Sequence, residues 1–341
     1  MKIKVSVIIV NYNGLKWLKK CLTSLSQQSY DNYEIIFVDN ASSDGSVLFV
    51  KRHFPKVKLV RLQSNSGFAK GNNEGYKISK GEYLILLNND TCVPDNFIQK
   101  FITAFDNPKV GIAQAKLILM SDGKSMDSCG SFWTQTTLLY HFGNGKDSIL
   151  KKYNKALKIF SVKGAAMMVR RGIVESVGLF DPDFWSYYEE TDLCHRVWIS
   201  GYECWYWPAA TCFHAQGGTS RTLFGNKYSL IQYHNFKNKI MSYVKNFEVQ
   251  TLIYVLPTAL FVNFIIATIW LFQGKYRYSM SIIRAWVWNV KHLSSNLKKR
   301  KKIQMARIIS DEEIMSQVMR LPRSLAYYYY LFTDNISQYE D

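Results

Sequence analysis

Acidic side chains stand at three places in this sequence where they can do chemistry. The first is the stretch YLILLNNDTCVP (83–94), in which five apolar or aromatic residues run directly into Asn88, Asn89 and Asp90. Such a run is typical of a strand covered on both faces, and ligands bind at the carboxyl ends of strands in open α/β sheets. An acidic side chain there can hold a divalent cation against a diphosphate. The alternative is a simple turn, since Asn and Asp favour turns.

The second place is the acidic start of a helix that the pattern predicts over 187–200. Asp192 lies four residues before Arg196, so the two can form an ion pair on one helix face. Glu190 has no charged residue at that offset and points about 100° away from Glu189. If that direction is a cleft, Glu190 can take a proton from a substrate hydroxyl. The alternative is a solvated acidic helix start, which the helix dipole favours.

The third place is Asp39, at the end of a strand in VDNASSDGS. A carboxylate there can accept hydrogen bonds from a base or ribose, or it can cap the following helix. Gly67, after Asn65 and Ser66, opens another helix whose first amide groups can meet phosphate. No GxGxxG follows the first strand, so we expect no dinucleotide site there.

Strands and helices must position these side chains, and they alternate four times in the first hundred residues. This alternation predicts an α/β fold with a parallel sheet. The pattern loosens beyond 110, with a long loop region expected at 121–155 and a Gly-rich loop at 214–220. The expected strands are 5–10, 33–38, 57–62, 83–87, 111–120, 160–169 and 203–207, and the main expected helices begin near 15, 65, 95 and 187.

Composition narrows the class of protein. The chain has 341 residues, 48% of them hydrophobic and 15% aromatic, which excludes a disordered protein. The net charge of +17 suggests a nucleic acid, an anionic membrane or an anionic substrate as partner. The basic residues cluster beside an apolar stretch near the C-terminus, so we expect a membrane and no nucleic acid. The six cysteines show no CxxC spacing, which favours free thiols in a reducing compartment.

The apolar stretch 249–274 has no charged residue and is long enough to cross a bilayer. Pro257 and Asn263 interrupt it, and basic residues flank it on both sides. We therefore expect a helix in the membrane interface or a re-entrant hairpin, at the cytoplasmic face of the cell membrane. The basic run 298–302 would attract anionic lipid. The alternative is a pair of buried helices followed by a solvated basic helix.

Seven motifs in order resemble glycosyltransferase family 2, which has the GT-A fold. They cover roughly residues 3–222 and are most similar to the rhamnosyltransferase-like branch. The motifs are VSVIIVNYNG, VDNASSDGS, NSGFAKGNNEG, YLILLNND, VKGAAMMVRR, GLFDPDFWSYYEETDLCHRVWISGY and HAQGGTS.

The resemblance implies a role for each matching position. Asp90 corresponds to the acidic end of the family's DxD motif, and His214 completes its metal site, with Mg or Mn as the cation. Glu190 corresponds to the general base, supported by Glu189 and Asp192. This sequence departs from the motif because Asn occupies 88 and 89. The residues implied to bind the nucleotide sugar are Asn11, Tyr12, Asp39, Asn65, Gly67, Phe68, Asn73, Asn88 and Asn89, and those expected at the acceptor are Lys163, Gly164, Trp185 and Tyr188.

These roles predict an inverting transfer from a nucleoside-diphosphate sugar, such as dTDP-rhamnose or a UDP-sugar, to a glycan or polyprenyl-linked acceptor. We expect a nucleotide-sugar half at 1–110, an acceptor-binding and catalytic half at 111–248, and a membrane-associated helical region at 249–341. The loop 217–221 is expected to close over the diphosphate. The alternative function is a non-catalytic nucleotide-sugar-binding or scaffold protein at the membrane. The oligomeric state stays open.

Overall fold

Strands and helices alternate through the first hundred residues of the structure, as the sequence predicts. The structure is a computed structural model that describes residues 4–215 and 228–320. The strands are β1 (Val5–Asn11), β2 (Tyr33–Asp39), β3 (Lys58–Arg61), β4 (Tyr83–Asn88), β5 (Thr91–Cys92), β6 (Val110–Leu119), β7 (Met126–Ser128), β8 (Ser131–Phe132), β9 (Tyr140–His141), β10 (Leu157–Lys158), β11 (Ala166–Arg170) and β12 (Glu203–His214). The α-helices are α1 (Leu15–Ser26), α2 (Ser46–His53), α3 (Gly67–Ile78), α4 (Phe97–Ile102), α5 (Arg171–Val177), α6 (Glu189–Ile199), α8 (Tyr228–Asn246), α9 (Val249–Phe272), α10 (Tyr276–Lys291), α11 (Leu293–Met305) and α12 (Asp311–Val318).

The main sheet has the order β10-β12-β6-β11-β4-β1-β2-β3 and is mixed: the pairs β1–β2, β1–β4, β2–β3 and β6–β12 are parallel, and the others are antiparallel. β11 is antiparallel to both of its neighbours, β4 and β6. In register, Asn11 of β1 pairs with Asp39 of β2, and Val10 pairs with Asn88 of β4. The carboxyl ends of these three strands therefore meet at one edge of the sheet, where ligands bind in such folds.

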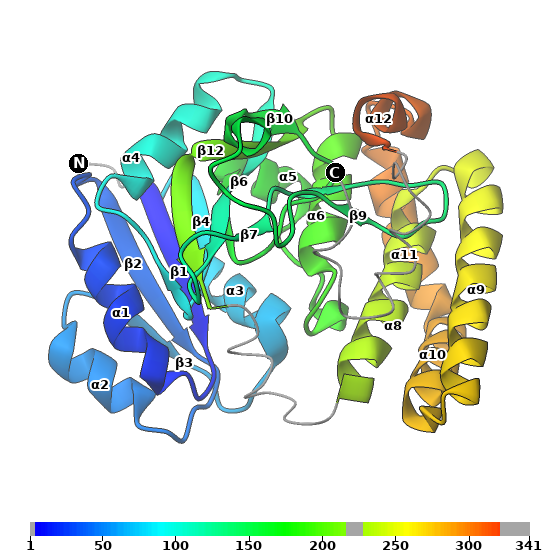
Figure 1. Cartoon of the computed structure of the whole chain (residues 1–341), viewed down its shortest axis with the longest axis horizontal. Coiled ribbons are helices and arrows are strands. Elements are labelled where there is room, and N and C mark those ends of the chain that lie inside the picture. Colours follow the sequence, from blue (N-terminus) through cyan, green and yellow to red (C-terminus); the bar gives the residue numbers. More distant parts are fainter. Residues whose placement is uncertain (1–3, 216–227, 321–341) are drawn as a thin grey trace.

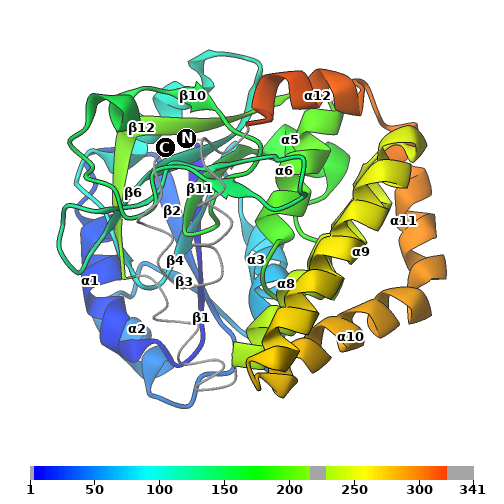
Figure 2. The same cartoon turned by 45° about the vertical axis from the view of Figure 1, so that its right-hand side comes forward.

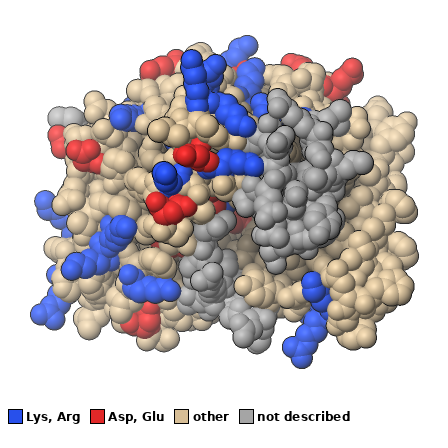
Figure 3. Space-filling view, viewed as in Figure 1, with Lys and Arg blue, Asp and Glu red and all other residues tan. Residues whose placement is uncertain are grey.

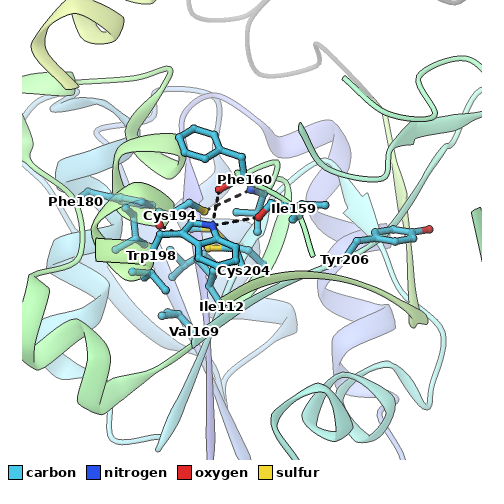
Figure 4. Packing of buried hydrophobic residues seen from close by; sticks show 14 of the residues in the cluster. Ile112, Ile159, Phe160, Val169, Phe180, Cys194, Trp198, Cys204 and Tyr206 are labelled. Carbon is cyan, nitrogen blue, oxygen red and sulfur yellow. Dashed lines mark hydrogen bonds between the residues drawn. The ribbon is translucent and has the colours of Figure 1, made fainter. Parts of the chain in front are cut away.

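Alternating side chains of each strand face two apolar layers. Ile9 packs in the layer that holds the buried face of α1 and α4, and Ile8 packs in the layer that holds α3 and α6. A Cβ atom at Gly71 would lie 2.7 Å from Cγ1 of Val10, so a glycine lets α3 approach β1 this closely. Figure 4 shows the second layer, where the indole of Trp198 donates hydrogen bonds to the carbonyls of Ile159 and Phe160.

Three elements differ from the prediction. β12 continues to His214 instead of ending near Trp207, because a register shift between Trp207 and Thr211 lets it pair with β6 again. The strand expected at 160–169 is only Ala166–Arg170. The region expected to be a loop, 121–155, contains the short strands β7, β8 and β9. All six cysteines are free, as predicted.

The helices α8 to α11 stand together at one side of the sheet, opposite α1 and α2 (Figures 1 and 2). The predicted interruption of 249–274 is wrong, since α9 runs unbroken through Pro257. Proline removes one N–H donor, but the other hydrogen bonds of a 24-residue helix can maintain it. α8 packs against α9, α10 and α11, and it shares one small core with α9 and α10.

The basic run 298–302 lies in α11, and its members divide into two groups. Lys299 forms ion pairs with Asp181 and Asp183, and Arg300 donates to the carbonyls of Val244 and Phe247. Lys298, Lys301 and Lys302 are exposed. Only part of the predicted lipid-attracting cluster therefore faces solvent, because two of its members hold α11 against the rest of the chain.

Candidate active site

Asp39 presents a free carboxylate oxygen at the sheet edge. It is 2% exposed, and its Oδ2 atom accepts a hydrogen bond from the Ser42 amide at 3.0 Å. Its Oδ1 atom is buried and accepts no hydrogen bond from the described residues. Buried polar atoms are almost always paired, so this oxygen is suited to accept a hydrogen bond from a ligand.

Asn11 and Asn89, which are both predicted to bind the nucleotide sugar, form a hydrogen bond with each other. The Asn89 amide donates to Oδ1 of Asn11 at 2.6 Å, and Asn11 in turn donates to Oγ of Ser42 at 3.1 Å. These bonds tie the ends of β1, β2 and β4 together, which keeps the sheet edge rigid. Tyr12 and Asn88 lie beside them, half-buried.

Gly67 begins α3 in a conformation that favours glycine, with φ of +83°. A Cβ atom there would lie 2.3 Å from the carbonyl oxygen of Trp185, and the amide of Ala69 donates to the same oxygen at 3.1 Å. The Asn65 side chain accepts from the Gly67 amide at 3.1 Å. Trp185, expected at the acceptor, therefore lies against the start of α3 and does not line the cavity beside Glu190 described below.

Asn73 and Phe68, which are also predicted to bind the nucleotide sugar, contact a neighbouring loop. The Asn73 amide donates to the Phe180 carbonyl at 2.8 Å and accepts from the Phe180 amide at 3.1 Å. Phe68 packs against the Phe180 ring, with ring centroids 6.0 Å apart. These contacts fix the loop that leads to α6.

Asp90 and His214 meet at the ends of β4 and β12. Asp90 is buried, its Oδ1 atom accepts no hydrogen bond from the described residues, and it lies 3.3 Å from Nε2 of His214. The two residues are 124 positions apart, yet β12 brings them together because β5, just after Asp90, pairs with the end of β12. The predicted metal-binding residues are thus neighbours.

Asp127 lies behind His214 and links it to Lys163. Its Oδ2 atom is 2.8 Å from Nδ1 of His214, and its Oδ1 atom is 2.5 Å from the Lys163 ammonium. Burial opposes the charge of Asp127, but Lys163 and His214 outweigh it and hold the pKa of this carboxyl well below its usual range. Burial also opposes the charge of the His214 ring, but Asp127 and Asp90 raise the pKa of His214 to about 9.

This arrangement fits a divalent cation with few protein ligands. Neighbouring ligands of an octahedral ion at about 2.1 Å lie about 3 Å apart, close to the separation of Asp90 Oδ1 and His214 Nε2. A ligating histidine usually donates its other N–H to a carboxylate, as His214 can do to Asp127. Within 4–215 and 228–320, no group of three or more acidic, His or Cys side chains forms a complete metal site. A cation here would therefore need oxygens from the substrate.

Glu190 lines a cavity of about 480 Å³ on the other side of Lys163. Burial raises the pKa of Glu190, while the charge of Lys163 and the amides of Gly164 and Thr191 partly oppose this rise. A Cβ atom at Gly164 would lie 3.8 Å from Cβ of Glu190, and Tyr188 lines the same cavity. Three of the four predicted acceptor residues, Lys163, Gly164 and Tyr188, are thus beside Glu190.

The other two members of the acidic trio are more buried. Burial and the charge of Glu190 raise the pKa of Glu189 well above its usual value. Asp192 is fully buried and forms the predicted pair with Arg196 at 2.9 Å, together with a pair to Lys245 at 3.1 Å. Burial opposes the charge of Asp192, but Lys245 and Arg196 keep the pKa of Asp192 below its usual value. Asp192 is therefore part of the framework.

The segment just before α6 holds an unusual backbone. Trp185, Tyr187 and Tyr188 have φ of +63°, +71° and +70°, which side-chain-bearing residues rarely adopt. The side-chain amide of Asn238, on α8, donates to the carbonyls of Phe184, Ser186 and Tyr187 at 2.6–3.0 Å. α8 thus holds the strained segment that presents Glu190.

Sequence patterns did not reveal Asp127 or Asn238. Asp127 lies in a region that has no clear periodicity, and Asn238 lies in a helix with no motif around it. Only their long-range contacts, 87 and 51–54 residues away, reveal their roles. The predicted closing loop 217–221 lies outside the described residues.

Comparison with known proteins shows the family of the chain. The profile described as "Glycosyl transferase family 2" matches residues 6–178. An uncharacterized glycosyltransferase of Haemophilus influenzae is 31% identical over 121 residues, or 35% of this chain and 41% of that protein. The poly-beta-1,6-N-acetyl-D-glucosamine synthase of Staphylococcus epidermidis is 24% identical over 301 residues, or 82% of this chain and 69% of that protein.

The fold has solved counterparts. A mannosyltransferase from Pyrobaculum calidifontis, solved with GDP-mannose and Mn²⁺, has a TM-score of 0.53 at 16% identity, covering 85% of this chain and 88% of that one. The chain spans 33% to 65% of the length of three bacterial glycosyltransferases that it matches. The rhamnosyltransferase-like branch stays a prediction. Because the family profile covers half of the chain and the fold is GT-A, the chain belongs to glycosyltransferase family 2.

Proposed function

We propose that this glycosyltransferase moves a sugar from a nucleoside-diphosphate sugar to a hydroxyl of a glycan or polyprenyl-linked acceptor, with inversion at the anomeric carbon. The acceptor would belong to a cell-surface polysaccharide or glycolipid. The Staphylococcus epidermidis relative makes a polysaccharide, and the mannosyltransferase of similar fold binds GDP-mannose and Mn²⁺.

The observation that carries this proposal is a continuous line of contacts. It runs from Asp90 to His214, to Asp127 and to Lys163, and Lys163 lines the cavity together with Glu190. A donor held at Asp90 would therefore have its anomeric carbon near an acceptor held at Glu190. A non-catalytic scaffold protein would not need a candidate base, Glu190, next to this chain of acidic and basic side chains. The arrangement therefore favours a catalytic function over a scaffold function.

Residues of the chain would bind the donor at two points. The free Oδ1 atom of Asp39 would accept a hydrogen bond from the base or ribose. A Mg or Mn ion held by Asp90 and His214 would supply positive charge to the leaving diphosphate.

Glu190 would act as the base. Burial raises the pKa of Glu190, which makes it a better proton acceptor than an ordinary glutamate, and the charge of Lys163 opposes part of this rise. Burial and the charge of Glu190 raise the pKa of Glu189 well above its usual value, which disfavours Glu189 as the ionised base. As Glu190 takes the proton, the acceptor oxygen would form its bond to the anomeric carbon, and the bond to the diphosphate would break on the opposite face. One such displacement inverts the configuration.

We also propose that the protein associates with an anionic membrane surface through α9 and α10. α9 is the one helix among the described residues that is long and apolar enough to cross a membrane, with a mean hydropathy of 2.2. Phe261 and Phe264 of α9 are 64% and 58% exposed. The surface over α9, at the right of Figure 3, has few charged side chains. An exposed apolar face of this kind is unfavourable in water and is stabilised in a bilayer interface.

The experiment that tests the function is a donor screen that reads release of nucleoside diphosphate. We would offer the full chain UDP-, GDP- and dTDP-sugars with Mg²⁺ or Mn²⁺. We expect one donor class to release its nucleotide, and Asp90→Ala to abolish the release. Asp95→Ala is the control, because Asp95 is an exposed acidic residue five positions away. Equal release by wild type and Asp90→Ala, or full release in chelator, would contradict the assigned donor site.

A further inference from the structure

The cavity beside Glu190 extends well beyond the reacting groups. One wall carries Glu190 and Lys163, and the opposite wall is formed by α8 and α9 through Phe236, Ile266 and Trp270. Figure 2 shows α9 running alongside α8. A sugar hydroxyl at Glu190 accounts for the first wall only. The second wall combines these apolar side chains with the polar Gln232 and Asn235, and it carries one cation.

That cation is Lys239 of α8. Lys239 is 7% exposed and lines the cavity. Within the described part of the chain, its ammonium has no ion pair or hydrogen bond, and its nearest specific contact is the Tyr243 ring at 5.8 Å. Burial lowers the pKa of Lys239 to about 7, which reflects the cost of a buried charge without a partner.

Two neighbouring lysines of α8 have the hydrogen-bond or ion-pair partners that Lys239 lacks among the described residues. Lys237 donates to the Asp183 carbonyl at 2.6 Å, and Lys245 pairs with Asp181 and Asp192. A buried ammonium without such a partner is costly, so a protein usually pairs it. For Lys239 the partner must come from whatever fills the cavity. The complementary group is an anion such as a phosphate.

We propose that this cavity binds a lipid-linked acceptor, with its phosphate or diphosphate at Lys239, its apolar chain against Phe236, Ile266 and Trp270, and its sugar hydroxyl at Glu190. The proposal rests on the proposed function, because it takes the cavity as the acceptor site. It selects the lipid-linked acceptor over a soluble glycan. A soluble glycan would leave the ammonium unpaired and would place polar hydroxyls against the apolar side chains that α9 contributes, Ile266 and Trp270.

The position of α9 supports a lipid rather than a free anion. The same helix that supplies Ile266 and Trp270 to the cavity also carries the exposed Phe261 and Phe264. A lipid chain that leaves the cavity along α9 would remain next to the face proposed to meet the membrane. The transfer itself would leave the phosphate at Lys239 unchanged: only the acceptor O–H bond and the anomeric carbon–diphosphate bond break, and the proton passes to Glu190.

The test uses farnesyl phosphate, a short isoprenoid monophosphate, with the full chain in detergent micelles. Equilibrium binding would be compared between wild type and Lys239→Met. We expect the variant to bind at least about tenfold more weakly, the loss expected for one charge-assisted hydrogen bond. Lys239→Met removes an unpaired buried charge, so the variant should fold. Farnesol, which lacks the phosphate, should bind both proteins equally.

Two controls separate specific binding from general attraction. Lys291→Met removes an exposed cation next to the apolar helices and should leave farnesyl phosphate affinity unchanged. Asp90→Ala should also leave it unchanged, which would exclude binding at the donor site. If Lys239→Met binds farnesyl phosphate as well as wild type does, the proposal is wrong. If inorganic diphosphate binds as tightly as farnesyl phosphate, the site takes a soluble anion and the lipid part is wrong.

Binding of the nucleotide sugar distinguishes a failure of the proposed lipid-linked acceptor from a failure of the proposed function. Wild type and Lys239→Met should bind the nucleotide sugar equally, because Lys239 lies outside the donor edge. If neither protein binds any nucleotide sugar, the proposed function fails. If both bind it and farnesyl phosphate binding does not depend on Lys239, only the assignment of a lipid-linked acceptor fails.

Discussion

The Nδ1 atom of His214 lies 2.8 Å from the Oδ2 atom of Asp127, so the ring turns its Nε2 atom toward Asp90. A carboxylate that accepts from one ring nitrogen fixes which nitrogen is free to bind a cation. Asp127 also contacts Lys163 at 2.5 Å. Through this single residue, the candidate cation site and the acceptor cavity share one support.

Asp127→Asn should therefore weaken cation binding without removing either proposed ligand. Asparagine keeps the size of the side chain but loses the charge that orients His214 and holds Lys163. Loss of such a supporting carboxylate usually lowers metal affinity or activity about 10- to 100-fold. We expect a loss of this size in a Mn²⁺ titration of donor binding.

The control for this variant is Asp122→Asn, five residues earlier. Asp122 is exposed and accepts hydrogen bonds only from its own turn. In the Mn²⁺ titration, Asp122→Asn should bind Mn²⁺ as tightly as wild type does. If Asp127→Asn binds Mn²⁺ as well as wild type does, the supporting role of Asp127 is wrong.

The pH dependence of turnover should report the environment of Glu190. The base must be ionised, and burial raises the pKa of Glu190. Turnover should therefore be present at higher pH and fall as the pH drops through a value above that of an ordinary glutamate. Lys163→Met removes a charge that opposes the rise, so its acid limb should move to higher pH. Lys155→Met, an exposed control, should leave the limb in place. A limb that moves to lower pH in Lys163→Met would contradict this assignment.

Asp192→Asn should lower stability rather than abolish donor binding. Asp192 is fully buried between Arg196 and Lys245, and removing one partner of a buried ion pair destabilises a protein by about 3 kcal/mol or more. Urea unfolding should show this loss in the free energy of unfolding. Because the pKa of Asp192 is below its usual value, its contribution is present above about pH 4 and is lost in acid, so the two proteins should converge there. Equal stability at neutral pH would contradict the framework role.

Much of the fold could be predicted from the sequence, since apolar runs and helical spacing are local signals. The first four strands, α1, α3 and α6 were predicted this way, and so was the Asp192–Arg196 pair. β12 was predicted too short because its second half pairs with β6 only after a register shift, which leaves no local pattern. Pro257 was read as an interruption, yet tertiary packing and helix length override one missing donor.

The candidate site was predictable only where a motif marked it. Asp90, His214 and Glu190 belong to motifs, and the structure brings the first two together and puts Glu190 in a cavity. Asp127 matters through its contacts with distant segments, and Lys239 matters through the cavity that it lines. No spacing rule describes either feature. Asn73 was expected at the donor, but its amide is used to hold the Phe180 loop.

The membrane face can be tested without truncation, which would break the contacts between α8 and the later helices. The double variant Phe261→Asp, Phe264→Asp places two charges on the exposed side of α9. Burial of one phenylalanine contributes about 2 kcal/mol, so binding to anionic vesicles should fall more than tenfold in a sedimentation assay. Ile149→Asp, at an apolar side chain outside α9 that is 79% exposed, should sediment like wild type. Unchanged binding of the double variant would refute the role of this face.

The most direct test of the account is the turnover of Glu190→Gln. Glutamine keeps the shape of Glu190 but cannot accept the proton, so turnover should fall by about a hundredfold or more. Nucleotide-sugar affinity should stay near that of wild type, because Glu190 lies on the acceptor side. Glu189→Gln should keep most of its turnover, since burial and the charge of Glu190 raise the pKa of Glu189 and disfavour its ionised form. Near-normal turnover in Glu190→Gln, with loss of turnover in Glu189→Gln at intact fold, would show that the base is Glu189 and that the central claim is wrong.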